Sequence, residues 1–253
     1  MVPDVRAVAG EGRDTVDTMS TERHSESVEN YLKTIFLLAE RWEGSVGVSA
    51  LAERLGVSSP SASGMVRKLV DGGLVDHARY AGITLTPAGR ASALAVVRRH
   101  RLIEMFLVTE LDLAWDEVHE EAEALEHAVS DRLLDRIDDR LGHPRFDPHG
   151  DPIPGRDGSL PEIRARRLPE LKFGEGGDLV RVDDTDPEVL RYLDARDVRL
   201  GDRVDLLSRR PFDGPFVVRL RCSDAEDRPA RDVEEEWGPT LARALWVGAT
   251  EPA

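Results

Sequence analysis

The chain has 253 residues, of which 34 are Lys or Arg and 49 are Asp or Glu, so that its formal net charge is −15. Its hydrophobic content of 40% is enough for a folded core and excludes a wholly disordered protein, while the single cysteine, Cys222, excludes an internal disulfide and a zinc site made of several cysteines. No apolar run is long enough for a membrane span and no secretion signal is visible, so we expect a cytoplasmic protein.

The charge is unevenly distributed. Residues 21–100 contain ten Lys or Arg and eight Asp or Glu, whereas residues 101–130 contain one Arg and nine carboxylates. An acidic protein would not normally bind nucleic acid, because phosphate contacts need a basic surface. A near-neutral part followed by a carboxylate-rich part instead suggests contact with a polyanion and then binding of a cation.

The first part of the chain has the element order of a winged helix-turn-helix. Residues 1–20 lack periodicity and are predicted to form a flexible tail. Apolar spacing and Gly and Pro positions then predict helices over 27–41, 48–55 and 60–72, followed by a short hairpin around Ala81-Gly82. We expect residues 21–93 to form the DNA-binding domain, with the helix over 60–72 in the major groove.

Small and hydroxyl residues open this recognition helix and allow the backbone to approach DNA, and basic residues follow them. The candidate DNA-binding residues are Ser58, Ser59, Pro60, Ser61, Ser63, Gly64, Arg67, Lys68 and, on the hairpin, Arg79. The alternative is a three-helix unit that serves in dimerisation or in another protein contact.

The rest of the chain is predicted to be helical and then β. Thr86-Pro87 caps a helix that runs to about 109, and one apolar stripe predicts a single helix over 116–141. These helices fall in a metal-binding and dimerisation domain over 94–160, which ends in a connection rich in Pro, Gly and Asp over 142–162. A linker over 161–176 and a small β-domain over 177–253 complete a mainly α fold.

Histidines and glutamates share one side of two predicted helices. His119, Glu123, Glu126 and His127 lie at positions i, i+4, i+7 and i+8, and His100 and Glu104 lie at i and i+4. Packed together, these carboxylates would repel one another unless a divalent cation compensated them, and imidazole with carboxylate suits Mn, Fe, Zn, Ni or Co. The alternative is a solvated helix face. We expect His143 and His149, in the connection, to be exposed or in turns, and we assign no role to His24 and His77.

A winged helix followed by RRH100RLIE104, EVH119EEAE123ALE126H127 and DPHGDPIPG resembles the metal-dependent repressors of the diphtheria toxin repressor family, and most closely their manganese transport regulators. The resemblance covers about 27–156 and implies an SH3-like (FeoA-like) fold for the β-domain. It implies a primary site of Asn30, Glu123, Glu126 and His127 and an ancillary site of His100, Glu104 and His119, with Asp184 and Asp186 as further candidates.

Three positions, Asn30, Lys33 and Glu123, distinguish this sequence from one or another ligand pattern of the family. Iron-responsive members have Cys in place of Glu123 and Met in place of Asn30, whereas manganese-responsive members have Glu and an Asp. Lys33 stands where short manganese regulators have a Glu, which argues against a bridged pair of metals. Hard oxygen donors suit Mn²⁺ better than soft sulfur does, so the residues favour manganese over iron.

The resemblance implies a homodimeric, manganese-dependent repressor that binds palindromic operators of metal-uptake genes. Fe²⁺ is the second candidate cofactor, and Zn²⁺, Co²⁺ or Ni²⁺ are expected to substitute in vitro. Two hypotheses from different classes compete with this one: a winged-helix regulator that senses an organic ligand, and a His/Glu di-metal hydrolase. Because neither a phosphate-binding loop nor a nucleophile motif is present, we expect no enzymatic activity. We also expect no small organic substrate and no membrane partner.

Overall fold

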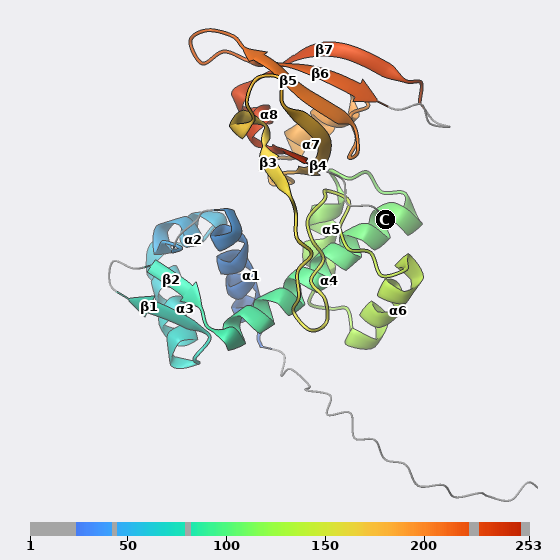
Figure 1. Ribbon diagram of the computed structural model, residues 1–253. Coiled ribbons are helices and arrows are strands. Elements are labelled where there is room, and N and C mark those ends of the chain that lie inside the picture. The colour runs from blue at the N-terminus through green and yellow to red at the C-terminus, as the bar shows by residue number, and fades with distance from the viewer. Residues whose placement is uncertain (1–23, 42–44, 79–81, 223–227, 249–253) are drawn as a thin grey trace, which may run out of the picture.

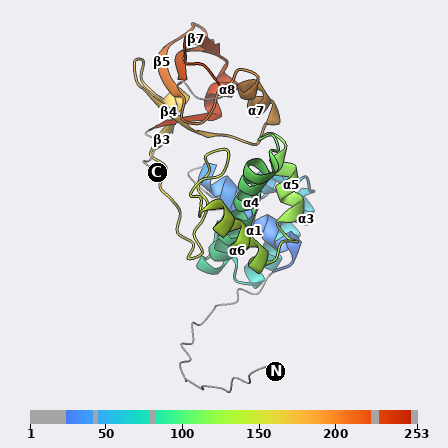
Figure 2. The same ribbon diagram turned by 90° about the vertical axis from the view of Figure 1, so that its right-hand side faces the viewer.

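The computed structural model describes residues 24–41, 45–78, 82–222 and 228–248. The predicted tail over 1–20 lies outside these residues. A winged helix-turn-helix unit, a helical unit and a β-domain follow one another along the chain and are packed together (Figures 1 and 2). Within the described residues, no helix is long and apolar enough to cross a membrane.

The winged helix-turn-helix forms as the sequence predicts. Its elements are α1 (Glu26–Arg41), α2 (Val48–Arg54), α3 (Ser59–Asp71), β1 (Val75–Ala78) and β2 (Gly82–Leu85), the two strands pairing antiparallel. Pro60 lies in the first turn of α3, and the Ser58 hydroxyl caps the helix by accepting a hydrogen bond from the Ser61 backbone N–H. Apolar side chains of α1, α2, α3 and the strands form one buried core. This core holds α3 by one face and leaves its other face exposed at the surface of the unit.

The long helix α4 (Pro87–Leu111) connects the DNA-binding unit with the helical unit (Figure 1). As predicted, the Thr86 hydroxyl caps α4, accepting a hydrogen bond from the Gly89 backbone N–H at 3.1 Å. Helix α1 packs along α4, and α5 and α6 pack on its other part. Side chains of α4 can therefore reach both the DNA-binding unit and α5.

The single helix predicted over 116–141 is wrong, because the chain forms α5 (Val118–Leu125) and α6 (Asp131–Leu141). Ser130 starts the second helix by accepting a hydrogen bond from the Leu133 N–H. The apolar stripe predicted along this helix is therefore interrupted, and two of its residues, Leu125 and Leu133, are 37% and 51% exposed. Glu126 lies at the end of α5, just before the break, and is fully buried.

The β-domain is a six-stranded antiparallel sheet in the order β3-β8-β4-β5-β6-β7. The strands are β3 (Ala165–Arg167), β4 (Gly176–Val182), β5 (Arg203–Arg209), β6 (Phe216–Cys222), β7 (Arg231–Trp237) and β8 (Leu245–Gly248), and the helices are η1 (Leu168–Glu170), α7 (Pro187–Asp194) and α8 (Pro239–Arg243). The residues 161–176, predicted to be a linker, thus contribute β3 and η1. Sequence reasoning also missed β7, α7 and α8.

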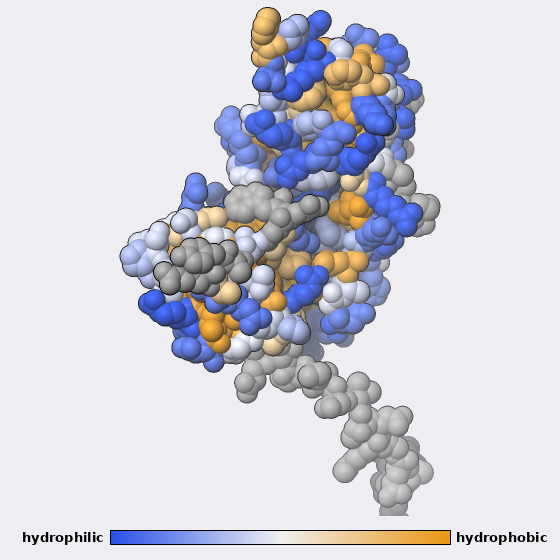
Figure 3. Space-filling model, turned by 60° about the vertical axis from the view of Figure 1, so that its left-hand side comes forward, coloured by the Kyte–Doolittle hydropathy of each residue, from blue (hydrophilic) through white to orange (hydrophobic). Residues whose placement is uncertain are grey.

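Hydrophilic side chains cover much of the β-domain surface in the space-filling view (Figure 3). Exposed charged side chains of this domain form ion pairs, such as Arg210 with Glu236 at 2.6 Å and Arg219 with Glu234 at 3.1 Å. The apolar side chains of the sheet, with those of α7 and α8, instead form a separate buried core that contains the fully buried Trp237. The β-domain therefore has its own core, distinct from those of the two helical units.

The connection over 142–162 has no regular element, as predicted, but it is held tightly between the helical unit and the β-domain. Gly150 has φ +86°, and a Cβ there would lie 2.0 Å from the Val180 carbonyl oxygen of β4. The Val182 backbone N–H donates to the His149 carbonyl at 2.9 Å. Close backbone packing therefore places the side chains of this loop beside α4.

Candidate metal centre

The polar face of α1 meets α4 and α5 below the β-domain. Four polar or charged residues of α1 face inward although they interrupt an otherwise apolar buried surface: Glu29, Asn30, Lys33 and Thr34. Asn30, Lys33 and Thr34 border a cavity of about 610 Å³ whose other walls come mainly from α4, α5, the 147–151 loop and α7. Charged side chains outnumber apolar ones in the lining of this cavity, which favours an ion over an apolar ligand.

Three of the four residues expected in the primary site lie in direct contact. The Nε2 atom of His127 is 2.7 Å from the Asn30 Oδ1 and 3.3 Å from the Glu126 Oε1. Glu123, the fourth, lies one turn further back on α5 and is joined to Glu126 through the Lys33 ammonium, which is 2.7 Å from an oxygen of each. The site thus combines α1 of the DNA-binding unit with the end of α5.

Glu29 was not anticipated from the sequence. Its Oε2 is 2.9 Å from the His127 Nδ1 and 3.4 Å from the Arg99 guanidinium. A carboxylate on one imidazole nitrogen orients the ring and favours binding of a metal through the other nitrogen, here the Nε2 that faces Asn30. The signal in the sequence was the position of Glu29 beside Asn30 on the same helix.

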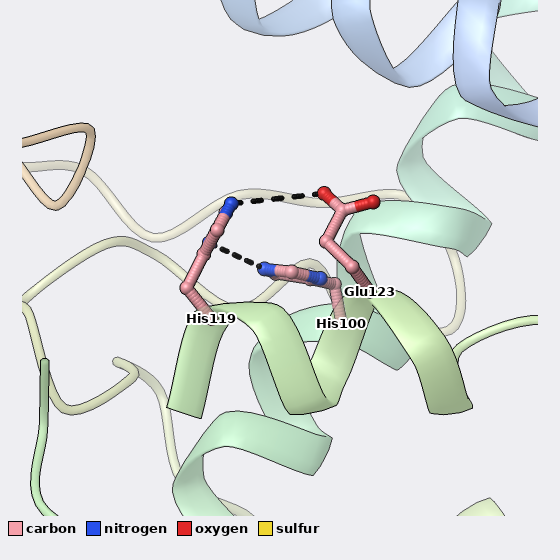
Figure 4. Close-up of side chains that lie close together, drawn as sticks. All are labelled: His100, His119 and Glu123. Atoms are coloured by element: carbon pink, nitrogen blue, oxygen red, sulfur yellow. Dashed lines mark hydrogen bonds and ion pairs between the residues drawn. The ribbon is translucent and has the colours of Figure 1, made fainter. Parts of the chain in front are cut away.

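The ancillary residues also meet. The His100 Nε2 is 2.9 Å from the Glu104 Oε1 and 3.3 Å from the His119 Nδ1. Figure 4 shows His100 and His119 beside Glu123, whose Oε1 is 3.7 Å from the His119 Nε2. One donor atom each from His100, His119 and Glu123 falls within 4.8 Å of the others, so these three side chains can share one ion. Glu123 therefore lies between the primary and the ancillary sets.

The β-domain contributes Asp184 but not Asp186. The Asp184 Oδ2 is 3.4 Å from the His119 Nδ1, and Glu104, His119 and Asp184 form a second group with metal-binding geometry. Asp186 instead caps α7, because its Oδ1 accepts a hydrogen bond from the Glu188 backbone N–H at 3.0 Å. Its predicted candidacy as a ligand has no support in this geometry.

The expectation that His149 is exposed or has only a turn role is wrong. Its side chain is completely buried, and its donor atom lies with those of Glu104 and Asp147 within 4.8 Å. The Nε2 is 2.8 Å from the Trp115 carbonyl oxygen, which it meets as a donor, and the buried Nδ1 has no hydrogen-bond partner among the described residues. A buried imidazole nitrogen with a free lone pair beside two carboxylates fits a divalent cation well. His143, by contrast, is 67% exposed, as expected.

The negative charge of the clustered carboxylates in this centre is compensated by bound protons and by the Lys33 ammonium. Although burial opposes charging, the carboxylates of Glu104 and Glu126 raise the pKa of His100 to about 9, and hydrogen bonds to Asp184 and Glu104 raise the pKa of His119 to about 10. Burial, together with the charges of Asp151 and Glu104, raises the pKa of Asp147 to about 8. Protons thus occupy positions that a divalent cation can take.

We expect the melting temperature of the metal-free protein to fall as the pH rises from about 6.5 to about 10. A pKa that is raised in the folded state stabilises the protein below the unfolded pKa, and this contribution is lost as the pH passes the folded value. This pH window runs from 6.5 to about 9 for His100 and from 6.5 to about 10 for His119. The raised pKa of Asp147 also lowers the stability as the pH rises, up to about pH 8. Thermal unfolding in EDTA over this range measures the effect, and His119→Gln should reduce the slope.

Manganese affinity should rise over the same range, because the ion competes with protons for imidazole and carboxylate. Each proton displaced contributes about a tenfold rise in affinity per pH unit. Calorimetry at several pH values in buffers of different ionisation enthalpy counts these protons. A melting temperature and an affinity that are both independent of pH would contradict the assigned charge balance.

The candidate DNA-binding residues lie on α3 and just before it. Ser58, Ser59, Pro60 and Ser61 are exposed, Ser63 and Gly64 are half-buried, and Arg67 and Lys68 are exposed. Ser58 caps the helix, and its hydroxyl is 2.9 Å from that of Ser61. Arg79 lies outside the described residues.

Known sequence families match three successive segments of the chain. Residues 24–83 match the iron-dependent repressor N-terminal DNA-binding domain, residues 86–155 the iron-dependent repressor metal-binding and dimerisation domain, and residues 166–225 the FeoA domain. The diphtheria toxin repressor of Corynebacterium diphtheriae is 34% identical over 228 residues, which cover 85% of this chain and 93% of that protein. The iron-dependent repressor IdeR of Mycobacterium leprae is 40% identical over 157 residues, covering 59% and 67%. The match to IdeR of Mycobacterium tuberculosis spans about half the length of that relative, 56%.

Solved structures share the whole arrangement. A structure described as a manganese-dependent transcriptional repressor in complex with manganese is 47% identical, has a TM-score of 0.80 and covers 88% of this chain and all of its own. The repressor ScaR with bound Cd²⁺ is 30% identical, with a TM-score of 0.74 and coverage of 88% and 99%. The fold predicted from the resemblance, with its winged helix, helical unit and SH3-like β-domain, is confirmed by these matches.

Proposed function

Because this chain belongs to the diphtheria toxin repressor family of metal-dependent transcriptional repressors, we propose that it is a manganese-responsive repressor that binds palindromic operators of metal-uptake genes as a homodimer in the cytoplasm. The observation that carries the proposal is the contact of Asn30 on α1 with His127 just after α5, whose Nε2 also lies 3.3 Å from the Glu126 Oε1. An ion there would join the DNA-binding unit to the helical unit. Binding would thereby fix one orientation of the two units relative to each other.

The residues that would hold the primary ion are Asn30, Glu123, Glu126 and His127, with Glu29 orienting the imidazole. A second ion would be held by Glu104, His119 and Asp184, with His100 in contact with Glu104, or else by Glu104, Asp147 and His149. Glu104 belongs to both of these groups, so we propose one additional ion rather than two. This ion would attach the β-domain and the 147–151 loop to α4.

Manganese is favoured by the donor set, in which oxygen and nitrogen atoms occur and sulfur does not: Cys222 is buried in the β-domain away from these groups. Hard oxygen donors suit Mn²⁺, a weak binder among divalent transition metals. A solved structure with manganese, at 47% identity, is consistent with this choice. Iron remains the second candidate, because the matching DNA-binding and metal-binding domains are described as those of iron-dependent repressors.

The experiment that tests the proposal is operator binding over buffered series of free Mn²⁺ and Fe²⁺. A palindromic operator is first selected from random DNA in the presence of each metal, and fluorescence anisotropy then gives the affinity. We expect binding to require metal and to reach half-saturation at physiological free Mn²⁺. Binding that is equally strong in EDTA would contradict metal dependence, and a response confined to Fe²⁺ would replace manganese by iron.

Helix α3 is the proposed recognition helix, and a dimer would place its two copies in successive major grooves about 34 Å apart. We expect Arg67→Ala to weaken binding to all DNA sequences about equally and to reduce the slope of log affinity against log salt by about one. Arg67 is exposed one turn after the small residues, which suits a phosphate contact. Ser63→Ala should instead alter the preference among operator bases, and a sequence-selective loss in Arg67→Ala would contradict this assignment.

A further inference from the structure

Lys33 places a positive charge inside the proposed primary site. Its side chain is 6% exposed, and its Nζ is 2.7 Å from the Glu123 Oε1 and 2.7 and 2.8 Å from the two oxygens of Glu126. An ammonium group has three hydrogens to donate and is a compact charge, so these contacts satisfy it. Lys33 therefore neutralises the two carboxylates that the primary ion would need.

The ammonium and a metal ion cannot occupy these oxygens together. Glu126 is fully buried, and its Oε2 already meets the His100 Nδ1 at 2.7 Å. An ion bound by the Nε2 of His127 would contact the Oε1 of Glu126, which the ammonium also contacts. Two cations on one buried carboxylate repel strongly, because water does not screen them there.

The ammonium has a route out of the site. Lys33 lines the cavity of about 610 Å³, as do Glu120 and Glu123, and the Glu123 side chain is 40% exposed. The flexible four-carbon stem of Lys33 can swing towards this open side while its ammonium keeps a carboxylate or water as partner. Glu126, in contrast, is fully buried, so the ammonium loses its contact with Glu126 when it moves to the open side.

From this geometry we propose that Lys33 is a tethered competitor of the activating metal ion, which holds Glu126 in the metal-free protein and must leave it before the ion binds. Lys33 then sets the metal concentration at which the repressor responds. The inference rests on the proposed function, since it assumes that the ion binds at Asn30, Glu126 and His127. It predicts that removal of the charge strengthens metal binding. If Lys33 only filled space, its replacement by a side chain of the same length would leave metal affinity unchanged.

The test is Mn²⁺ binding to the full-length protein without DNA, measured by calorimetry. Lys33→Met, which retains the length of the side chain without its charge, should raise the affinity at least about tenfold and lower the melting temperature of the metal-free protein. Lys33→Arg should bind Mn²⁺ with an affinity close to that of the wild type. Lys172→Met, which removes an exposed charge in the β-domain, is the matched control and should change neither quantity.

A wild-type experiment keeps the inference testable if the Lys33→Met protein does not fold. An amine-acylating reagent with mass spectrometry reports how accessible Lys33 is relative to Lys172. Acylation of Lys33 should be slow in EDTA and several-fold faster with saturating Mn²⁺. Unchanged protection of Lys33 with Mn²⁺, or equal or weaker Mn²⁺ affinity of Lys33→Met, overturns the proposal, whereas a wild-type protein that binds no metal would overturn the proposed function itself.

Discussion

Replacing Glu126 by Gln should abolish metal-dependent operator binding, with the Mn²⁺ concentration needed for half-saturation raised at least about 100-fold. Loss of a group that only orients a ligand typically costs 10- to 100-fold in metal affinity, and Glu126 is placed as a ligand itself. It is fully buried and contacts Lys33, His100 and His127. Gln retains the volume but removes the charge on which all three contacts depend.

The matched control is Glu121→Gln, an exposed residue of the same helix, which should leave the response to Mn²⁺ unchanged. Sedimentation should show the same oligomeric state for both variants, because neither side chain belongs to the apolar cores. Calorimetry separates metal affinity from DNA affinity. A Glu126→Gln protein that binds Mn²⁺ as tightly as the wild type would show that Glu126 is not a ligand.

The DNA-binding unit was predictable because its signals are local. Apolar residues at helical spacing predicted α1, and the small and proline residues at 56–60 predicted the turn before α3. Thr86-Pro87 likewise predicted the start of α4. In each case the residues that determine the element lie within a few positions of it.

Other elements depend on contacts that a local pattern does not contain. The apolar spacing continues from α5 into α6, so it obscured the break that Ser130 introduces, although Ser130 followed by Asp131 was a usable cap signal. Strand β7 has charged residues that pair with β6, as Glu234 does with Arg219, and so it lacked an apolar pattern.

Local sequence spacing likewise predicted some of the candidate metal ligands, but not those that only the tertiary fold brings together. Helical spacing groups His119, Glu123 and Glu126, but only the fold brings Asp147 and His149 to Glu104. A stretch rich in Pro, Gly and Asp predicts an exposed loop, whereas here Gly150 allows it to pack directly against β4. Burial of His149 is thus a property of the domain arrangement and not of its neighbours in sequence.

The double variant Asn30→Met with Glu123→Cys should change the order in which metals activate the protein, from Mn²⁺ first to Fe²⁺ or Co²⁺ first. The Asn30 Oδ1 lies 2.7 Å from the His127 Nε2, so it would face an ion bound there, and Glu123 lies at the open side of the site. Both changes replace a hard oxygen donor by soft sulfur, which favours Fe²⁺ and Co²⁺ over Mn²⁺. We expect the ratio of the Co²⁺ and Mn²⁺ affinities to rise by at least about tenfold.

The measurement is operator affinity at fixed free Mn²⁺, Fe²⁺ and Co²⁺ under reducing conditions, because an exposed thiol at position 123 oxidises readily. Asn30→Leu with Glu123→Ala is the control, since it removes the same oxygen donors without supplying sulfur and should weaken the binding of all three metals. If the sulfur variant and the wild type rank the metals identically, these two positions do not set selectivity. The donors around Glu104, Asp147 and His149, which both proteins share, would then be the groups that distinguish one metal from another.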